Sequence, residues 1–351
     1  MYVFRRLLPA AAALTMAASA ASIPLAAMAQ GSQEKVLNLY TARHYQTDEA
    51  LYSNFTKQTG IKINRIEGQE DPLLERIKSE GANSPADVFI TVDIGRLWRA
   101  QQAGVFAPVK SKVLESRIPA NFRDPNGEWF GFSARARVIA YNKDTVKPGD
   151  IKTYEDLADP KWKGKLCTRS SGHVYNLSLI SSLIAHDGEA KTERWAQGVV
   201  ANLARTPKGG DTDQLKAVAA GECDLAISNT YYIARLLKST KPEDKAVADK
   251  LGVVWPNQDS QGVHMNISGG GMLKHAPNKE SAVKFLEYLA SDEAQAYFAN
   301  GNNEWPVVPS VKVANPALEA LGSFKADRIN VAELGKYQPV AQKLADKAGF
   351  K

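Results

Sequence analysis

The stretch GECDLAISNTYYIARLLK, residues Gly221 to Lys238, decides how this chain folds and where a ligand binds. Asp224 to Ile227 is a short apolar run typical of a buried strand, and Ser228 to Thr230 supply side chains that cap helices. Tyr231 to Lys238 has helical composition, so two adjacent tyrosines fall in the first turn. Open α/β sheets bind ligands beyond the carboxyl ends of their strands, which makes this corner a candidate binding site. Packing of both tyrosines under a neighbouring loop is the alternative.

The amino terminus indicates export. Arg5 and Arg6 precede an alanine- and leucine-rich segment that ends in Ala-Met-Ala at 27–29, a pattern typical of a cleaved secretory signal peptide. We expect residues 1–29 to be removed and the mature protein to be exported. A membrane anchor is the alternative, but Pro24 and the small residues lower the hydropathy of this segment. The pattern leaves open whether export follows the general or the twin-arginine route.

Net charge and chain length limit the possible functions and the number of domains. Loss of the signal peptide removes two arginines and no acidic residue, which lowers the formal net charge from +6 to +4. This charge is too small and too dispersed to indicate nucleic-acid binding. The remaining chain of about 320 residues exceeds one comfortable hydrophobic core, so two domains are expected.

The mature chain begins with alternating strand and helix signals. The expected strands are short runs rich in apolar residues at 36–40, 61–66 and 87–91. Helical patterns lie between them, and this βαβαβ order predicts a parallel sheet with right-handed crossovers and ligand sites at the strand ends. The first such end carries His44 and Tyr45, for which an ordinary surface loop is the alternative.

The segment WFGFSARARVIAYN, residues 129–142, predicts a pair of strands with alternating side chains. Arg135 and Arg137 are two positions apart and therefore point to one face, while Val138 and Ala140 point to the other. Two guanidinium groups on one face of a largely apolar strand suggest an anion or a phenolate as partner. A solvent-facing sheet edge is the alternative.

After a polar segment at 150–164, the alternation of strands and helices continues. A strand at 165–168 leads to a helix at 175–185, which places Tyr175 at a helix amino end as well. Residues 263–275 have strand character but contain three consecutive glycines, which suggests close backbone packing or a crossing between lobes. The remaining helical patterns cover 191–204, 280–300 and 316–350.

The candidate site gathers one histidine and four tyrosines at strand ends: His44, Tyr45, Tyr175, Tyr231 and Tyr232. Phenolate oxygen is a hard anionic donor that suits a highly charged hard cation, and ferric iron is the natural candidate. Deprotonating a phenol of pKa about 10 at pH 7 costs roughly 4 kcal/mol, so only a strongly attracting metal offsets several such steps. The chain lacks the usual zinc patterns, a phosphate-binding Gly-Lys-Ser/Thr loop and a G-x-S-x-G elbow, and gives no positive sign of an enzyme.

Cys167 and Cys223 are the only cysteines, an even count in an exported chain. Each lies in or beside a predicted strand that leads to a candidate tyrosine, so a disulfide is feasible if those strands are neighbours. Two buried free thiols are the alternative.

Four runs together resemble the periplasmic ferric-ion-binding proteins of ABC-type iron importers: YTARHY at 40–45, SARARVIAYN at 133–142, CTRSSGHVYN at 167–176 and GECDLAISNTYY at 221–232. The resemblance covers nearly the whole mature chain. It implies the α/β, two-lobed type II periplasmic-binding-protein fold, in which each lobe is a mixed, mostly parallel sheet flanked by helices and crossing strands form a hinge. The lobes implied are 30–137 with 262–310 and 138–261 with 311–351.

The resemblance also implies roles for individual residues. The matching metal ligands are His44, Tyr45, Tyr175, Tyr231 and Tyr232. Arg135 matches the arginine of the family's binding cleft, although Arg137 is close enough to leave that choice open. The implied ligand is ferric iron, with the participation of an anion such as carbonate left open. The implied partner is an ABC-type permease in the inner membrane, and a monomer without nucleic acid is expected.

Three alternatives remain at this point. Related binding proteins carry thiamine, polyamines, phosphonates or sulfate, but four tyrosines favour iron over these. An exported enzyme that uses Tyr or His as acid or base would need a reactive partner constellation that the sequence does not show. A sensor that is presented to a membrane kinase would be compatible with iron binding.

Overall fold

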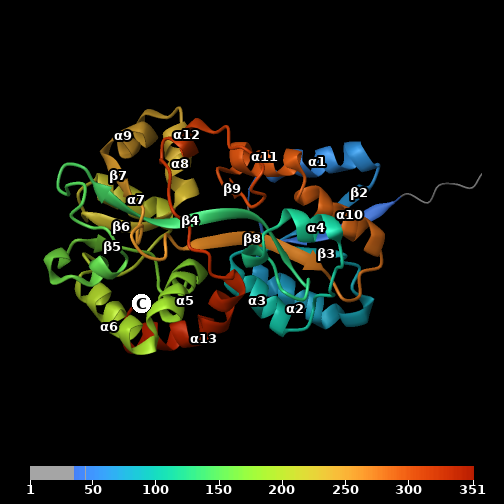
Figure 1. Ribbon diagram of the computed structural model, residues 1–351, viewed down its shortest axis with the longest axis horizontal. Coiled ribbons are helices and arrows are strands. Elements are labelled where there is room, and N and C mark those ends of the chain that lie inside the picture. Colours follow the sequence, from blue (N-terminus) through green and yellow to red (C-terminus); the bar gives the residue numbers. More distant parts are fainter. Residues whose placement is uncertain (1–34, 44) are drawn as a thin grey trace, which may run out of the picture. The chain divides into compact units, whose positions relative to one another are not determined.

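The computed structural model describes residues 35–43 and 45–351, so the predicted signal peptide and His44 lie outside the described residues. Within this part of the chain the strands form one nine-stranded sheet in the order β2-β1-β3-β8-β4-β6-β5, and β7 and β9 each pair with β4 (Figure 1). The strands are β1 (Val36–Thr41), β2 (Lys62–Glu67), β3 (Val88–Val92), β4 (Phe130–Asn142), β5 (Leu166–Cys167), β6 (Leu225–Asn229), β7 (Leu251–Val254), β8 (Met265–Met272) and β9 (Trp305–Pro306).

Thirteen α-helices occur in the described residues, and none of them is long and apolar enough to cross a membrane. The helices are α1 (Asp48–Thr59), α2 (Glu70–Glu80), α3 (Ile94–Gln102), α4 (Lys112–Arg117), α5 (Val174–Asp187), α6 (Glu189–Ala201), α7 (Asp211–Ala219), α8 (Thr230–Lys238), α9 (Pro242–Lys250), α10 (Lys279–Leu289), α11 (Asp292–Asn302), α12 (Pro316–Glu319) and α13 (Val331–Lys347).

The first three strands form the predicted βαβαβ unit. β1 pairs in parallel with both β2 and β3, which confirms the parallel arrangement expected for this segment. Alternation along these strands supplies two cores. Leu39 and Val88 join the core beneath α1 and α10, whereas Tyr40 and Phe89 join the core beneath α2 and α3 (Figure 1). Both faces of this part of the sheet are therefore covered by helices.

β4 connects the two halves of the sheet. Its residues 130–136 pair with β8, whereas its residues 137–142 pair with β6 and β7. The segment expected to be a pair of strands is thus one strand of 13 residues, with a register shift between Gly131 and Ser133. It can stay continuous because each half finds a different partner. The pairings of β4 and β8 are antiparallel, so the expectation of a mostly parallel sheet does not hold at this crossing.

Three consecutive glycines do not interrupt β8, which runs through Gly269, Gly270 and Gly271 between β3 and β4. A Cβ at Gly270 would lie 2.3 Å from the carbonyl oxygen of Phe89. Close backbone packing, one of the two readings offered by the sequence, is therefore what these glycines provide.

The other half of the sheet carries the disulfide. β5 pairs in parallel with β6, and Cys167 at the end of β5 is bonded to Cys223, which precedes β6. This confirms the predicted pairing. The closed loop contains α5, α6 and α7, and the disulfide lies behind the two strand ends that lead to Tyr175 and Tyr231.

Candidate functional site

Four tyrosines converge from three segments that follow strands. Tyr45 lies in the loop between β1 and α1, Tyr175 in the first turn of α5, and Tyr231 and Tyr232 in the first turn of α8 directly after β6. Tyr45, Tyr175 and Tyr231 are buried, and Tyr232 is partly buried. The structure brings together the four tyrosines that the sequence analysis singled out, while His44 lies outside the described residues.

The phenol rings contact one another directly. The hydroxyl oxygens of Tyr175 and Tyr231 are 3.2 Å apart. The ring of Tyr45 meets Tyr231 edge to face with centroids 6.0 Å apart, and the rings of Tyr231 and Tyr232 lie 4.2 Å apart. Val92, the last residue of β3, completes a small apolar cluster with Tyr45 and Tyr231. Two phenol oxygens thus already lie close to the separation that a shared metal ion would require.

Burial keeps these phenols protonated. Burial raises the pKa of Tyr175 to about 12, although the positive charge of Arg135 opposes this effect. Burial raises the pKa of Tyr45 and of Tyr231 well above the usual value; the charge of Glu304 acts in the same direction on Tyr45, and the neighbouring tyrosines do so on both. A metal ion bound here would therefore have to displace protons from the ligands.

Arg135 and Arg137 both lie near the ring of Tyr175, with guanidinium carbons 5.7 and 5.9 Å from its centroid. They share a face, as their spacing predicted, but both are about 1 % exposed, so the solvent-facing alternative is wrong. Arg137 binds Asp211 at 2.9 Å and the side-chain oxygens of Asn229 and Asn176. Its charge is therefore satisfied by residues beside the site.

Fewer of the hydrogen-bond donors of Arg135 have a partner. Its Nη1 donates to Ser268 at 2.7 Å and lies 3.6 Å from Glu304. Its Nε and Nη2 are buried and have no hydrogen-bond partner among the described residues. The electrostatic partners of this guanidinium include Tyr45, Tyr175 and Tyr231. Of the two arginines left open by the sequence, Arg135 has two unpartnered donors to offer a ligand, whereas only Nε of Arg137 lacks a partner among the described residues.

Asn229 explains why the helix cap expected for α8 is not formed. It occupies the N-cap position, but its side chain makes no capping hydrogen bond. Its oxygen accepts from Arg137, and its backbone N–H donates to Asp211. Asn229 lies directly opposite Arg137 in the pairing of β4 with β6. Its side chain therefore binds this buried arginine and does not cap α8.

Glu304 is a site residue that sequence reasoning missed. Its carboxylate is fully buried between α11 and β9, accepts from Tyr45 Oη at 3.1 Å and from Ser133 at 2.7 Å, and lies 3.5 Å from Arg43. Glu304 is 259 residues from Tyr45, and nothing in its local sequence marks it as different from a surface glutamate. Only the fold brings these groups together.

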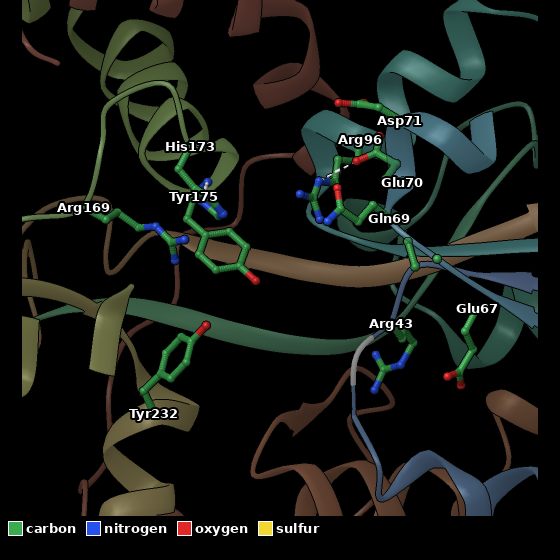
Figure 2. A pocket seen from close by; sticks show the side chains of 12 residues that line it. Arg43, Glu67, Gln69, Glu70, Asp71, Arg96, Arg169, His173, Tyr175 and Tyr232 are labelled. Atoms are coloured by element: carbon green, nitrogen blue, oxygen red, sulfur yellow. Dashed lines mark hydrogen bonds and ion pairs between the residues drawn. The ribbon is translucent and has the colours of Figure 1, made fainter. Parts of the chain in front are cut away.

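A cavity of about 600 Å³ opens beside the tyrosines. Figure 2 shows the hydroxyls of Tyr175 and Tyr232 directed into this space, with Arg43 on the opposite side. His173 also lines the cavity, accepts from the backbone N–H of Tyr175 through Nδ1, and packs its ring edge to face against Tyr175 at 4.5 Å. A solute that enters the cavity can therefore reach Tyr175 and Tyr232, whereas Tyr45 and Tyr231 lie buried behind its lining.

The described residues contain no cluster of three or more His, Cys, Asp or Glu side chains arranged to hold a metal ion. A metal centre in this part of the chain would thus depend on the phenol oxygens, which are donors for hard cations.

Comparisons with known proteins agree with this geometry. Residues 50–326 match the family model described as bacterial extracellular solute-binding protein. Iron uptake protein A1 of Synechocystis is 53 % identical over 321 residues, with 92 % of this chain and 89 % of that protein covered. The structure of the Trichodesmium protein IdiA (FutA) in complex with iron and citrate is 59 % identical, has a TM-score of 0.87, and covers 90 % of this chain and 100 % of its own. A ferric-binding protein of Campylobacter jejuni is 43 % identical with a TM-score of 0.85, covering 90 % of this chain and 100 % of its own.

Proposed function

Because this chain belongs to the family of bacterial extracellular solute-binding proteins, we propose that it captures ferric iron through tyrosine side chains and delivers it to a membrane permease. The family and the two-lobed fold expected from the sequence resemblance are confirmed by the relatives and the structural neighbours. The family is one of binding proteins, and we propose no catalytic role for the tyrosines.

The observation that carries the proposal is the convergence of the phenol oxygens, with those of Tyr175 and Tyr231 3.2 Å apart. Hard, anionic oxygen donors select a highly charged hard cation. Three or four phenolates would nearly neutralise a trivalent ion. We propose that the ligands are His44, Tyr45, Tyr175, Tyr231 and Tyr232. The relatives that carry iron in their names or descriptions support this choice of metal.

We propose that Arg135 balances the excess negative charge of the loaded site. Its Nε and Nη2 lack hydrogen-bond partners among the described residues, and its positive charge lowers the pKa of Tyr175 relative to burial alone. The same two donors suit a small anion that enters with the metal. Arg137 has less freedom, because Asp211, Asn229 and Asn176 bind both of its terminal nitrogens and only Nε lacks a partner among the described residues.

Delivery follows from the compartment and the family. The signal pattern at residues 1–29 and the periplasmic relatives support a mature protein in the periplasm. There the loaded protein would dock as a monomer on an ABC-type permease in the inner membrane, which would accept the iron.

The test is a visible absorption titration of the purified mature protein with a ferric chelate. Binding through tyrosinate produces a charge-transfer band that a carrier of an organic cation or an oxyanion lacks. Tyr231→Phe should weaken iron binding by about 100-fold or more in chelator competition, since removing one partner of a buried charge pair costs roughly 3–5 kcal/mol. Absence of the band in the parent protein would overturn the proposed function.

Tyr288→Phe is the matched control. Tyr288 is a buried tyrosine on α10 whose hydroxyl donates to the carbonyl of Leu51 at 3.0 Å, away from the site. Its loss should affect the thermal melt of the iron-free protein as much as Tyr231→Phe does, but should leave iron affinity unchanged. If both variants weakened iron binding equally, the effect would be one of stability and not of ligation.

A further inference from the structure

Asp93 is a buried carboxylate in an unusual backbone conformation at the end of β3. Its φ is +82°, a value that residues with a Cβ rarely adopt, and its side chain is fully buried. Oδ1 caps α3 by accepting from the backbone N–H of Gly95 at 2.8 Å, and Oδ2 accepts from Asn266 of β8 at 2.9 Å. Strained residues of this kind persist where their surroundings hold them, and they cluster at functional sites.

The same carboxylate reaches a different part of the chain. Ser178 of α5 donates to Asp93 Oδ1 at 2.7 Å, and Gln338 of α13 donates to the Ser178 hydroxyl at 2.9 Å. Gln338 lies so close to Gly95 that a Cβ there would be 2.5 Å from its amide. Asp93, Ser178 and Gln338 therefore form a chain of hydrogen bonds from the start of α3 to α5 and α13, buried at Asp93 and Ser178 and partly buried at Gln338.

This chain of hydrogen bonds joins the parts that carry the phenol ligands. Val92, next to Asp93, packs against Tyr45 and Tyr231. Ser178 lies one helical turn after Tyr175 on α5, so its position fixes where the first turn of that helix can stand. By the proposed lobe boundaries, Asp93 belongs to the first lobe and both Ser178 and Gln338 to the second.

We propose that Asp93 and Ser178 form a latch that positions Tyr175 against Tyr45 and holds the two lobes in the arrangement that binds metal. This inference rests on the proposed function. The hydroxyl of Ser178 donates to a carboxylate in a buried setting, where such hydrogen bonds are short and strong. The latch can exist only while α5 lies against the end of β3, so it stabilises that arrangement over any in which the lobes separate.

Within the described residues the hydroxyl of Ser178 bonds Asp93 and Gln338 and no phenol, and only Asp93 interacts electrostatically with Arg135, so a change at Ser178 leaves the proposed ligands themselves intact. The apparent affinity for a ligand falls in proportion when a smaller fraction of the protein is in the arrangement that binds it. Removing the latch should therefore weaken iron binding while leaving every ligand in place.

The experiment compares Ser178→Ala with Ser181→Ala. Both serines are fully buried on α5, but the Ser181 hydroxyl bonds only the carbonyl of Leu177 in its own helix. Ser178→Ala should weaken ferric iron binding by about three- to tenfold in chelator competition, because loss of one good hydrogen bond lowers the ratio of latched to open protein about tenfold. It should also enlarge the radius of gyration of the iron-free protein in small-angle scattering. Ser181→Ala should change neither quantity, while thermal melts of the two variants stay similar.

An unchanged radius and affinity in Ser178→Ala, or equal changes in both variants, would overturn the latch. The scattering measurement uses iron-free protein, so it decides the question even if the parent protein shows no tyrosinate charge-transfer band. Absence of that band in the parent protein would count against the proposed function. The radius of gyration of the iron-free Ser178→Ala variant would still show whether the latch exists.

Discussion

The phenol pair of Tyr175 and Tyr231 shows how a site can be specific for a strongly attracting cation. Their oxygens lie 3.2 Å apart and share a hydrogen bond, and burial raises the pKa of both. A phenol with a pKa of about 12, as Tyr175 has, costs roughly 7 kcal/mol to ionise at pH 7. A weakly charged ion cannot offset that cost, whereas a trivalent ion bound directly to the oxygens can.

Proton release should therefore accompany iron binding. Burial keeps Tyr45, Tyr175 and Tyr231 protonated without metal, and as proposed ligands they would lose these protons on coordination, so lower pH favours the metal-free form. The logarithm of the apparent affinity should rise with pH between 6 and 8 by about one unit per pH unit for each proton displaced. Chelator competition at several pH values, corrected for the chelator's own protonation, measures this slope.

Tyr175→Phe provides the sharper form of this prediction. The variant loses one titrating ligand, so its slope should be about one unit smaller than that of the parent. An identical slope in both proteins would mean that Tyr175 does not give up a proton on binding, and Tyr175 would then be removed from the ligand set.

Some of the site residues could be predicted from the sequence and others could not. The four tyrosines could be found because each follows a strand-like run. Arg135 and Arg137 could be placed on one face from their spacing, but the choice between them depends on Asp211, which is 74 residues from Arg137. Glu304 and Asp93 are acidic residues without any local motif, and their burial is decided by segments far away in the chain.

At the scale of elements, the glycines of β8 fix how closely β3 and β4 approach. Gly270→Ala would place a Cβ 2.3 Å from the carbonyl oxygen of Phe89, on backbone that cannot move away without breaking the sheet. We expect this variant to lower the free energy of unfolding by about 2–3 kcal/mol in urea denaturation, the usual cost of overpacking. Gly210→Ala is the control, because the nearest atom to its Cβ would be 3.8 Å away. Equal stability of the two variants would contradict the close packing.

The disulfide acts on a second element pair, β5 and the segment that precedes β6. Replacing both Cys167 and Cys223 with Ala should lower the free energy of unfolding of the iron-free protein by about 4 kcal/mol, from the entropy of a closed loop of roughly 57 residues. Urea denaturation of parent and variant measures the difference. Iron affinity under conditions where both are folded should change little, since the sulfurs bond each other and none of the proposed ligands is a cysteine. A large loss of affinity without a loss of stability would show instead that the disulfide shapes the site.

The strands expected at 36–40, 61–66 and 87–91 and the helix expected at 175–185 lie within two residues of β1, β2, β3 and α5. The sequence analysis did not single out α3, α4, α7, α9, β7 and β9, and the helical pattern at 316–350 is divided into α12 and α13. The unit from β1 to β3 was predictable because its contacts are local in the chain. β4 was not recognised as one strand, since its two halves pair with β8 and β6, which come at least 80 residues later. Periodicity reports which face of a strand is buried, but it contains no information about which strand will be the partner.

The whole molecule depends on β4 and β8, the strands that join the two halves of the sheet. Tyr45 belongs to the half that contains β1 and β3, whereas Tyr175, Tyr231 and Tyr232 belong to the half that contains β5 and β6. A metal ion that binds all four phenols must therefore bind both halves at once. We propose that the backbone at the crossing strands serves as the hinge between lobes 30–137 with 262–310 and 138–261 with 311–351.

Iron should consequently shift the protein towards the form in which the lobes are together. Small-angle scattering of the mature protein should give a smaller radius of gyration after addition of one equivalent of ferric chelate. The variant with both Tyr231→Phe and Tyr232→Phe is the control, because it retains the rings and the hinge but loses two ligands from one lobe, and its radius should not respond. A parent protein that shows the tyrosinate charge-transfer band while its radius stays constant would contradict closure, because the ligands from both lobes would then be in place before iron arrives.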